Sequence, residues 1–376
     1  MSALTRREWL KVAAATPAAL AAFPQFSFAA PAEKDVKAVV DKALEFFKGI
    51  QKDAGNFADP RAGEPGLTAL IAAALVRNGV PADNPVVAKA LKYLEGKVQK
   101  DGSIEAVRTS NYMTCLAIMA FKEANKGGKY TKVIEGAGKY VQSLQFADGL
   151  TEDDPNFGGA GYDKPGPRAR PDMSNPSFMV EALLAAGVSK DDPVIKRALT
   201  YVSRSQNLES EFNKLAFAGK AGADDKGGFV YNLADANDAK SPKRTADGGL
   251  RSEGGMTYAG LKSFLYAGVG KEDKRVKAAV DWIRRHYSVT ENPGQKDSGL
   301  FYYYHTFAKA MDALGEEPFV DAKGAKHDWR QELFDELKKR QKENGSWVNS
   351  NGAFLESEPA LATAFAVLAL SYCTKK

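Results

Sequence analysis

The sequence has few of the side chains on which disulfide frameworks and metal sites depend. It contains 2 cysteines and 3 histidines among 376 residues. Two cysteines cannot build a disulfide framework, nor can they make a zinc site alone. Cys115 and Cys373 both lie in apolar stretches with helical character, so we expect them to be buried free thiols that pack as small apolar residues. We also expect no metal and no cofactor.

A large excess of charge of one sign is also missing. Lys and Arg number 52 and Asp and Glu number 47, a net charge of +5, of which residues 1–29 contribute +2 (three basic residues against one acidic), which leaves about +3 for the rest. No Lys/Arg cluster is interleaved with aromatic residues. This balance excludes the electrostatic footprint of a nucleic-acid-binding protein. The same charge balance gives no indication that the protein binds anionic lipids. A peripheral membrane contact and the oligomeric state stay open.

The N-terminus predicts an export signal. An Arg6-Arg7 pair is followed by Trp9, Leu10 and Lys11, which fits the twin-arginine pattern, and the apolar stretch 12–23 is too short to span a membrane. Ser27 and Ala29 put small residues at the two positions that a signal peptidase reads, and the segment 30–32 is a second choice. The alternative is a frayed basic helix. We predict a twin-arginine signal peptide at 1–29, a single domain at 30–376, and a periplasmic or extracellular location.

The rest of the chain repeats one phrase about six times. An amphipathic helix that opens with valine is followed by a Gln- or Gly-rich loop and by a second, more apolar helix. The first unit spans residues 36–80, and later units open at Val86, Val133, Val194, Val276 and near Trp329. Such self-similarity indicates a repeat architecture in which each hairpin must stack on its neighbours.

The two helices of each unit differ in polarity. The second helices, such as 67–75, 113–121 and 360–370, are apolar nearly all round, which is typical of helices buried on every side. The first helices carry a charged face. We therefore predict an all-α fold, an α/α toroid (α6/α6 barrel), with the first helices in an outer ring and the second in an inner ring. Two long loops, 149–176 and 207–256, lead into inner helices, where we expect the cavity to open.

The loop phrase at 341–347, Gln-Lys-Glu-Asn-Gly-Ser-Trp, with weaker copies at 51–57, 99–103 and 145–149, resembles the repeat of squalene–hopene cyclases and protein prenyltransferase β-subunits. The resemblance implies a toroid around an apolar cavity. It also implies chemistry for which this chain lacks residues. The cyclase Asp-x-Asp-Asp acid is matched only by Asp172, because Ser174 and Asn175 stand at its second and third acidic positions. Neither is acidic enough to protonate an alkene.

The sequence also lacks part of the zinc site of the prenyltransferases. Tyr304-His305-Thr306 is similar to the histidine phrase of that family, but Glu253-Gly254-Gly255 stands where an Asp-x-Cys pair is expected. One histidine and one glutamate do not make a three-ligand zinc site, so the sequence argues against zinc.

What remains is a set of polar and aromatic residues at the starts of the second helices, which a toroid brings to one rim. We take Asp172, Glu253 and His305 as candidate catalytic residues. The candidate ligand-binding residues are Glu64, Asn111, Tyr112, Ser174, Asn175, Tyr258, Tyr302, Tyr304 and Glu358. Helix capping is the competing explanation for the carboxylates, Ser and Asn, and core packing for the aromatic residues.

Three functions stay open. The first is a terpene cyclase- or prenyltransferase-like protein that binds, and in one version transforms, a polyisoprenoid or other apolar small molecule. The second is a non-catalytic binding or scaffold protein. The third is an enzyme acting on an extracytoplasmic polysaccharide, since α/α toroids also host such activities. An apolar cavity floor favours the first, and a shallow groove with acidic pairs favours the third.

Overall fold

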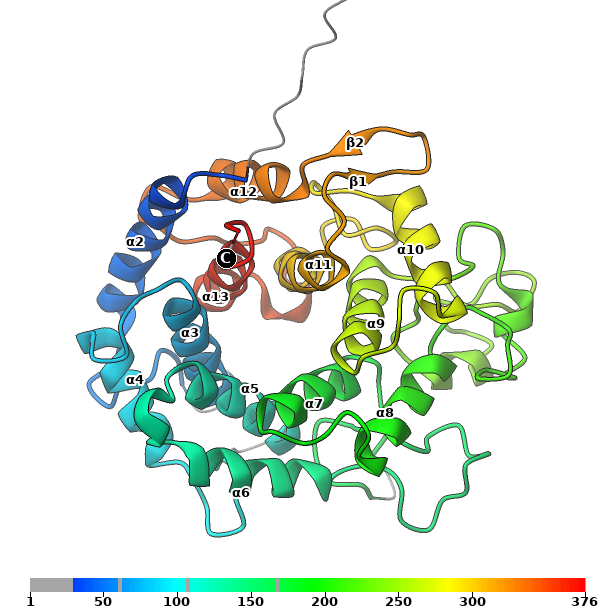
Figure 1. Cartoon of the computed structure of the whole chain (residues 1–376), viewed down its shortest axis with the longest axis horizontal. Coiled ribbons are helices and arrows are strands. Elements are labelled where there is room, and N and C mark those ends of the chain that lie inside the picture. The colour runs from blue at the N-terminus through cyan, green and yellow to red at the C-terminus, as the bar shows by residue number, and fades with distance from the viewer. Residues whose placement is uncertain (1–29, 60–62, 106–108, 167–168, 376) are drawn as a thin grey trace, which may run out of the picture.

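The computed structural model describes residues 30–59, 63–105, 109–166 and 169–375. These residues form twelve α-helices, four short 3-10 helices and one two-stranded ribbon. The predicted signal peptide lies outside the described residues. The helices alternate along the chain between two concentric rings (Figure 1). The outer ring consists of α2 (Glu33–Ile50), α4 (Pro85–Glu95), α6 (Thr131–Gln142), α8 (Pro193–Arg204), α10 (Lys274–His286) and α12 (Trp329–Arg340). The inner ring consists of α3 (Gly66–Arg77), α5 (Ser110–Glu123), α7 (Ser174–Ala185), α9 (Gly254–Tyr266), α11 (Leu300–Leu314) and α13 (Pro359–Leu370).

The inner ring is closed. Each inner helix packs on the next, from α3 through α5, α7, α9 and α11 to α13, and α13 returns to α3. Asn78, just after α3, donates a hydrogen bond from its side chain to the carbonyl of Val367 in α13 at 2.8 Å. The predicted all-α toroid is therefore confirmed, including the contact between the first and last repeats.

The helices form where the sequence pattern places them. Four outer helices begin at an Asn or Asp whose side chain accepts a hydrogen bond from a backbone N–H of the first turn. The N–H lies two residues later for Asn84, Asp192 and Asp273, and three residues later for Asp328. The inner helices are buried on nearly all sides, as their uniform apolar composition predicts. Cys115 and Cys373 are both buried and free, as predicted.

The repeated glutamine forms a joint between neighbouring outer helices. In the last repeat, the Gln341 side chain donates one hydrogen bond to Gly345 in its own loop and one to Val39 in α2, both at 3.0 Å. Gly345 has a φ of +86°, and a Cβ there would lie 2.2 Å from the Lys42 carbonyl oxygen. The same pair of bonds recurs in three other repeats, at Gln51, Gln145 and Gln206. The repeated phrase is therefore the device that attaches one hairpin to the next.

Replacing Gln341 with alanine should lower the free energy of unfolding by about 2 kcal/mol, since two hydrogen bonds worth about 1 kcal/mol each are lost. Gln99→Ala is the control, because the Gln99 amide bonds only the exposed Lys97 carbonyl, at 3.1 Å. Urea unfolding followed by circular dichroism measures both. Equal losses in the two variants would show that the joint is not what stabilises the ring.

The remaining segments connect the rings. The ribbon pairs β1 (Phe319–Val320) with β2 (Lys326–His327) between α11 and α12. The 3-10 helices are η1 (Lys126–Gly128), η2 (Ala218–Lys220), η3 (Leu233–Asn237) and η4 (Ala353–Leu355). The long loop before α9 has a small core, in which Phe217 and Leu250 pack with Tyr201 of α8. Among the described residues, no helix has both the length and the apolar character that crossing a membrane requires.

Candidate functional site

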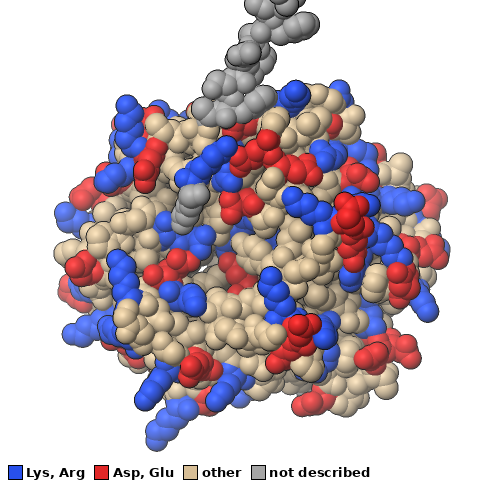
Figure 2. Space-filling model, viewed as in Figure 1, with Lys and Arg blue, Asp and Glu red and all other residues tan. Residues whose placement is uncertain are grey.

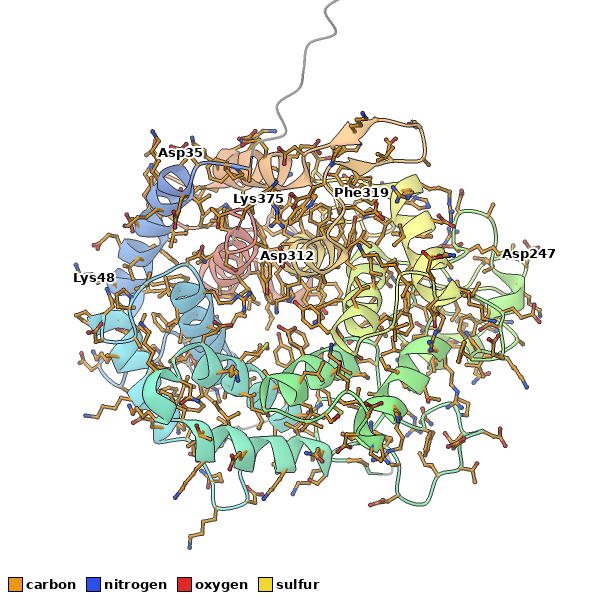
Figure 3. The ribbon with its side chains drawn as sticks, viewed as in Figure 1. Asp35, Lys48, Asp247, Asp312, Phe319 and Lys375 are labelled. Carbon is orange, nitrogen blue, oxygen red and sulfur yellow. The ribbon has the colours of Figure 1, made fainter. Side chains whose placement is uncertain are left out.

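A cavity of about 1020 Å³ opens at the N-terminal ends of the inner helices. All six inner helices contribute to its wall, so the starts of these helices face one end of the ring. Figure 3 shows the side chains around the axis: Asp312 on α11 lies near the centre, whereas Lys48 and Asp247 lie on the circumference. The wall is mostly apolar and includes Phe46, Ile50, Phe57, Leu67, Leu70, Met113, Leu116, Met256, Leu361 and Phe365.

Aromatic rings form the centre of this wall. Tyr112 meets Phe178 edge to face, with ring centroids 4.8 Å apart, and Tyr302 meets Phe365 in the same way at 5.8 Å. Phe178 also lies 6.3 Å from Tyr302. Edge-to-face contacts fix ring positions, and they leave ring faces and edges available to an apolar ligand. The floor of the cavity is thus apolar and deep.

His305 lies below the cavity and does not line it. Its ring stacks on Phe365 at 4.9 Å, and its Nδ1 lies 2.6 Å from the carbonyl oxygen of Tyr302. Burial, and then the charges of Lys309 and Lys262, hold the pKa of His305 well below its usual value. The ring is therefore neutral, Nδ1 donates to Tyr302, and Nε2 has no partner among the described residues.

Asp172 caps helix α7. One carboxylate oxygen accepts hydrogen bonds from the backbone N–H groups of Ser174 and Asn175, at 2.8 and 3.1 Å, and from the Ser174 hydroxyl at 2.6 Å. The other oxygen accepts from the Asn175 side chain at 2.8 Å. Burial raises the pKa of Asp172, against the effect of these four bonds, which favour the ionised form. All four bonds are donated to the carboxylate from the first turn of the helix, so its contacts are those of a cap.

Glu64 has a similar structural role at α3. Its two oxygens accept hydrogen bonds from the backbone N–H groups of Phe57, Ala58 and Thr68, at 2.9 to 3.3 Å. These bonds join the Gln51 loop to the first turn of the helix. Glu64 still borders the cavity. It is therefore both a cap and part of the rim.

Glu253 and Glu358 differ from these caps, because neither makes a side-chain cap bond although each immediately precedes an inner helix. Glu253 lines the cavity, is 7% exposed, and lies 2.7 Å from Lys243 of the long loop. Burial raises the pKa of Glu253, while Lys243 acts in the opposite direction. Glu358 is exposed at the mouth. Glu253 is thus a carboxyl group that faces the cavity beside a lysine.

The structure brings half of the predicted site residues to the cavity wall and places the other half behind it. Glu64, Tyr112, Ser174, Glu253, Tyr302 and Glu358 line the cavity. Asn111, Asp172, Asn175, Tyr258, Tyr304 and His305 are buried behind the wall. Tyr258, expected as a lining residue, instead packs in the core against Tyr303 and Phe307. Asn111 bonds the Gly161 carbonyl at 2.7 Å.

Several lining residues were not predicted. Tyr231, Asn292 and Gln295 come from loops, and loops carry no periodicity that would place them. Phe354 and Leu355 line the mouth with 61% and 58% of their surface exposed. Both have positive φ values, 57° and 63°, which are uncommon for large apolar residues. In the sequence, two consecutive large apolar residues within an otherwise polar loop are the signal that could identify them.

The described residues contain no group of three or more His, Cys, Asp or Glu side chains that could hold a metal ion. Glu253 and His305 contribute to no such cluster there. The absence of zinc remains a prediction.

Comparison with known proteins gives two kinds of match. Residues 41–225 match the sequence model of the squalene-hopene cyclase C-terminal domain. The fold is similar to that of the type II terpene cyclase MstE from Scytonema (TM-score 0.55, 12% identity, covering 91% of this chain and 98% of that one). It is also similar to an unsaturated glucuronyl hydrolase specific for heparin (TM-score 0.51, 14% identity, covering 90% and 96%). At these identities the structural matches establish the fold alone. No curated protein matches the sequence.

Proposed function

Because residues 41–225 match the squalene-hopene cyclase C-terminal domain and the chain forms an α/α toroid, we propose that its large cavity binds a polyisoprenoid or another apolar ligand. The observation that carries the proposal is the cavity itself, about 1020 Å³ with an aromatic and aliphatic wall. Ligand sites of 300–1,000 Å³ hold drug-sized molecules, and each buried CH₂ group contributes about 0.8 kcal/mol to transfer from water. That MstE is a terpene cyclase agrees with an isoprenoid ligand.

The polar groups of the cavity lie at its rim. Ser174, Glu253 and Gln295 belong to the lining there, whereas Leu70, Leu116 and Phe365 belong to its deeper part. An amphiphilic isoprenoid would therefore place its polar end toward the rim and its tail toward the axis. Protonation-initiated cyclisation forms no part of the proposal. Asp172 is engaged in four hydrogen bonds, and Glu253 is paired with Lys243.

The two rival functions receive less support. The glucuronyl hydrolase shares the fold alone, and the deeper part of the wall, which includes Leu70, Leu116 and Phe365, lacks the hydrogen-bonding groups that a sugar needs. A scaffold protein would have no use for a deep apolar cavity, which costs stability unless something fills it.

The proposal extends to location. We propose export by the twin-arginine route to the periplasm or the extracellular space, on the strength of the N-terminal pattern. Phe354 and Leu355, exposed at the mouth of the cavity, would contact a membrane surface from which an apolar ligand could enter.

Blocking the cavity tests the proposal. Ala360 at the start of α13 lines this cavity, so tryptophan there should weaken geranylgeraniol binding at least tenfold by occupying the ligand's volume. Ala185→Trp is the matched control, because Ala185 lines a different cavity at the end of α7. Equilibrium binding of radiolabelled geranylgeraniol measures both variants. Absence of binding to the unmodified protein, or equal binding to both variants, would overturn the proposal.

A further inference from the structure

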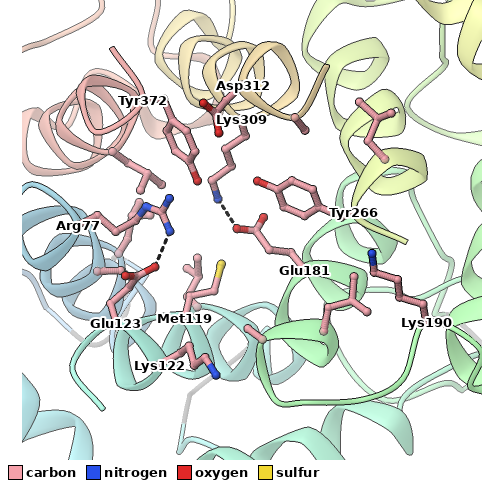
Figure 4. A pocket seen from close by; sticks show the side chains of 18 residues that line it. Arg77, Met119, Lys122, Glu123, Glu181, Lys190, Tyr266, Lys309, Asp312 and Tyr372 are labelled. Atoms are coloured by element: carbon pink, nitrogen blue, oxygen red, sulfur yellow. Dashed lines mark hydrogen bonds and ion pairs between the residues drawn. The ribbon is translucent and has the colours of Figure 1, made fainter. Parts of the chain in front are cut away.

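A second cavity, of about 550 Å³, lies at the opposite end of the inner ring (Figure 4). It is lined by the C-terminal halves of the inner helices, and it shares only Leu70 and Leu116 with the wall of the first cavity. Figure 2 shows charged side chains of both signs around a hollow at the centre of the ring. The second cavity is therefore separate from the site to which the function was assigned.

Three buried charges meet beside this cavity. Glu181 of α7 accepts a hydrogen bond from Lys309 of α11 at 2.6 Å and another from Lys262 of α9 at 2.7 Å. Their side chains are 12%, 2% and 1% exposed, in that order. Each charge stands in an inner helix that is otherwise mostly apolar. With two ammonium groups on one carboxylate, the cluster has one buried positive charge in excess.

The other charges of the cavity do not cancel this excess. Arg77 pairs with Glu123 and stacks on Tyr372, 4.6 Å from the ring centre. Asp312 pairs with Arg330 at 2.8 Å. Lys122 and Lys190 line the cavity and make no ion pair with any described residue. The remaining wall is apolar and includes Met119, Leu184, Leu265 and Leu368.

We propose that this second cavity binds a small amphiphilic anion, a carboxylate or a phosphate monoester, with its charged group against Lys309 and its tail along the apolar wall. An excess of buried charge is costly, and a bound anion would balance it. The Lys309 ammonium has three donors, of which Glu181 takes one. Lys309 lines the cavity, whereas Lys262 lies behind it.

The same arrangement makes binding pH-dependent. Burial lowers the pKa of Lys309 to about 8; Glu181 opposes this shift and Lys262 adds to it. The other charged or titratable groups around the cavity are Arg77, Lys122, Glu123, Lys190, Tyr266, His305, Asp312 and Tyr372. An anion pairs with the protonated amine, so affinity should fall as pH rises above about 8. An arginine at 309 stays charged and should abolish that fall.

Calorimetric titration at pH 7 with octanoate, octyl phosphate and octanol tests the proposal. Either anion should bind at least tenfold more tightly than octanol, and the tighter of the two identifies the preferred headgroup. Lys309→Met should weaken anion binding at least tenfold. This variant leaves Glu181 paired with Lys262, so it should fold, and thermal unfolding checks that it does. Lys37→Met on the outer face of α2 removes the same charge from an exposed pair and should change nothing.

The two blocking variants separate this proposal from the first one. Ala185→Trp should abolish octanoate binding, and Ala360→Trp should preserve it. Equal binding of octanol and octanoate, or unchanged binding in Lys309→Met, would overturn the inference. If Lys309→Met does not fold, Lys309→Arg decides: an undiminished fall in affinity above pH 8 would contradict a role for Lys309. Geranylgeraniol binding bears on the first cavity alone, so either proposal can fail without the other.

Discussion

Replacing Glu181 with glutamine is expected to lower the free energy of unfolding by about 3–5 kcal/mol. The substitution keeps the shape of the side chain but leaves Lys262 and Lys309 buried without their shared counter-ion. Urea unfolding at pH 7 measures the loss. Glu123→Gln is the control, because it breaks the single ion pair with Arg77 at a more exposed position. A smaller loss is expected there, about 1 kcal/mol or less.

The effect of Glu181→Gln should also depend on pH. Burial acts to raise the pKa of Glu181, but Lys262 and Lys309 outweigh it and hold that pKa well below its usual value of 4.5. A lowered carboxyl pKa stabilises the fold above the unfolded-state pKa, and this contribution is lost as pH falls toward the folded-state pKa. The difference between wild type and variant should therefore narrow below about pH 4.5. A constant difference from pH 7 to pH 3 would contradict the ion-pair account.

Asp172→Ala is expected to have an effect of similar size. Its removal leaves two backbone N–H groups, the Ser174 hydroxyl and the Asn175 amide without an acceptor in a buried place. At about 1–3 kcal/mol per buried unsatisfied group, and with partial relaxation, the loss should be roughly 3–6 kcal/mol. Thermal and urea unfolding measure it.

The chain offers a matched control for this substitution. Asp101 accepts hydrogen bonds from the backbone N–H and hydroxyl of Ser103, at 3.0 and 2.6 Å, in the same Asp-x-Ser arrangement but in an exposed loop. Asp101→Ala should have a much smaller effect, because water replaces the lost acceptor. If Asp172→Ala stays as stable as Asp101→Ala and loses ligand binding, Asp172 contacts the ligand and is not a cap.

The sequence predicts the ring well because the ring is built from a repeated signal. A glutamine and a glycine recur in four of the loops, as at Gln341 and Gly345, and the structure shows both residues at the joint between hairpins. The polarity difference between the two helices of each unit predicts which ring each helix joins. These features depend on residues close together in the chain, so one sequence is enough to identify them.

The faces of the inner helices are harder to predict. A helix that is apolar all round has no polar side to orient it, and for this reason Tyr258 was expected in the cavity although it lies in the core. In α11, however, the spacing of the polar residues indicates which face of the helix points toward the axis. Tyr302, Lys309 and Asp312 line the two cavities, and His305 lies between them in the helix and stacks on rings of α7 and α13, so residues at helical intervals mark the face toward the axis.

The buried charges are also visible in the sequence, although they belong to no motif. Glu181, Lys262 and Lys309 are each an ionised residue within a mostly apolar inner helix, seven to nine positions after its first residue. Equal depth in three neighbouring helices brings them together. Single charges at matching depths in separate apolar helices are thus a signal for a buried ion cluster, provided that the ring has been recognised first.

The closing joint between Gln341 and Val39 affects how the protein should unfold. In an open array of hairpins, the end units have one neighbour each, so they fray first and need polar caps. Here every hairpin has two neighbours, and separating any one of them breaks the packing of its inner helix on two others. No hairpin is therefore a preferred place for unfolding to start, and the ring should unfold as one cooperative unit instead of peeling from its termini.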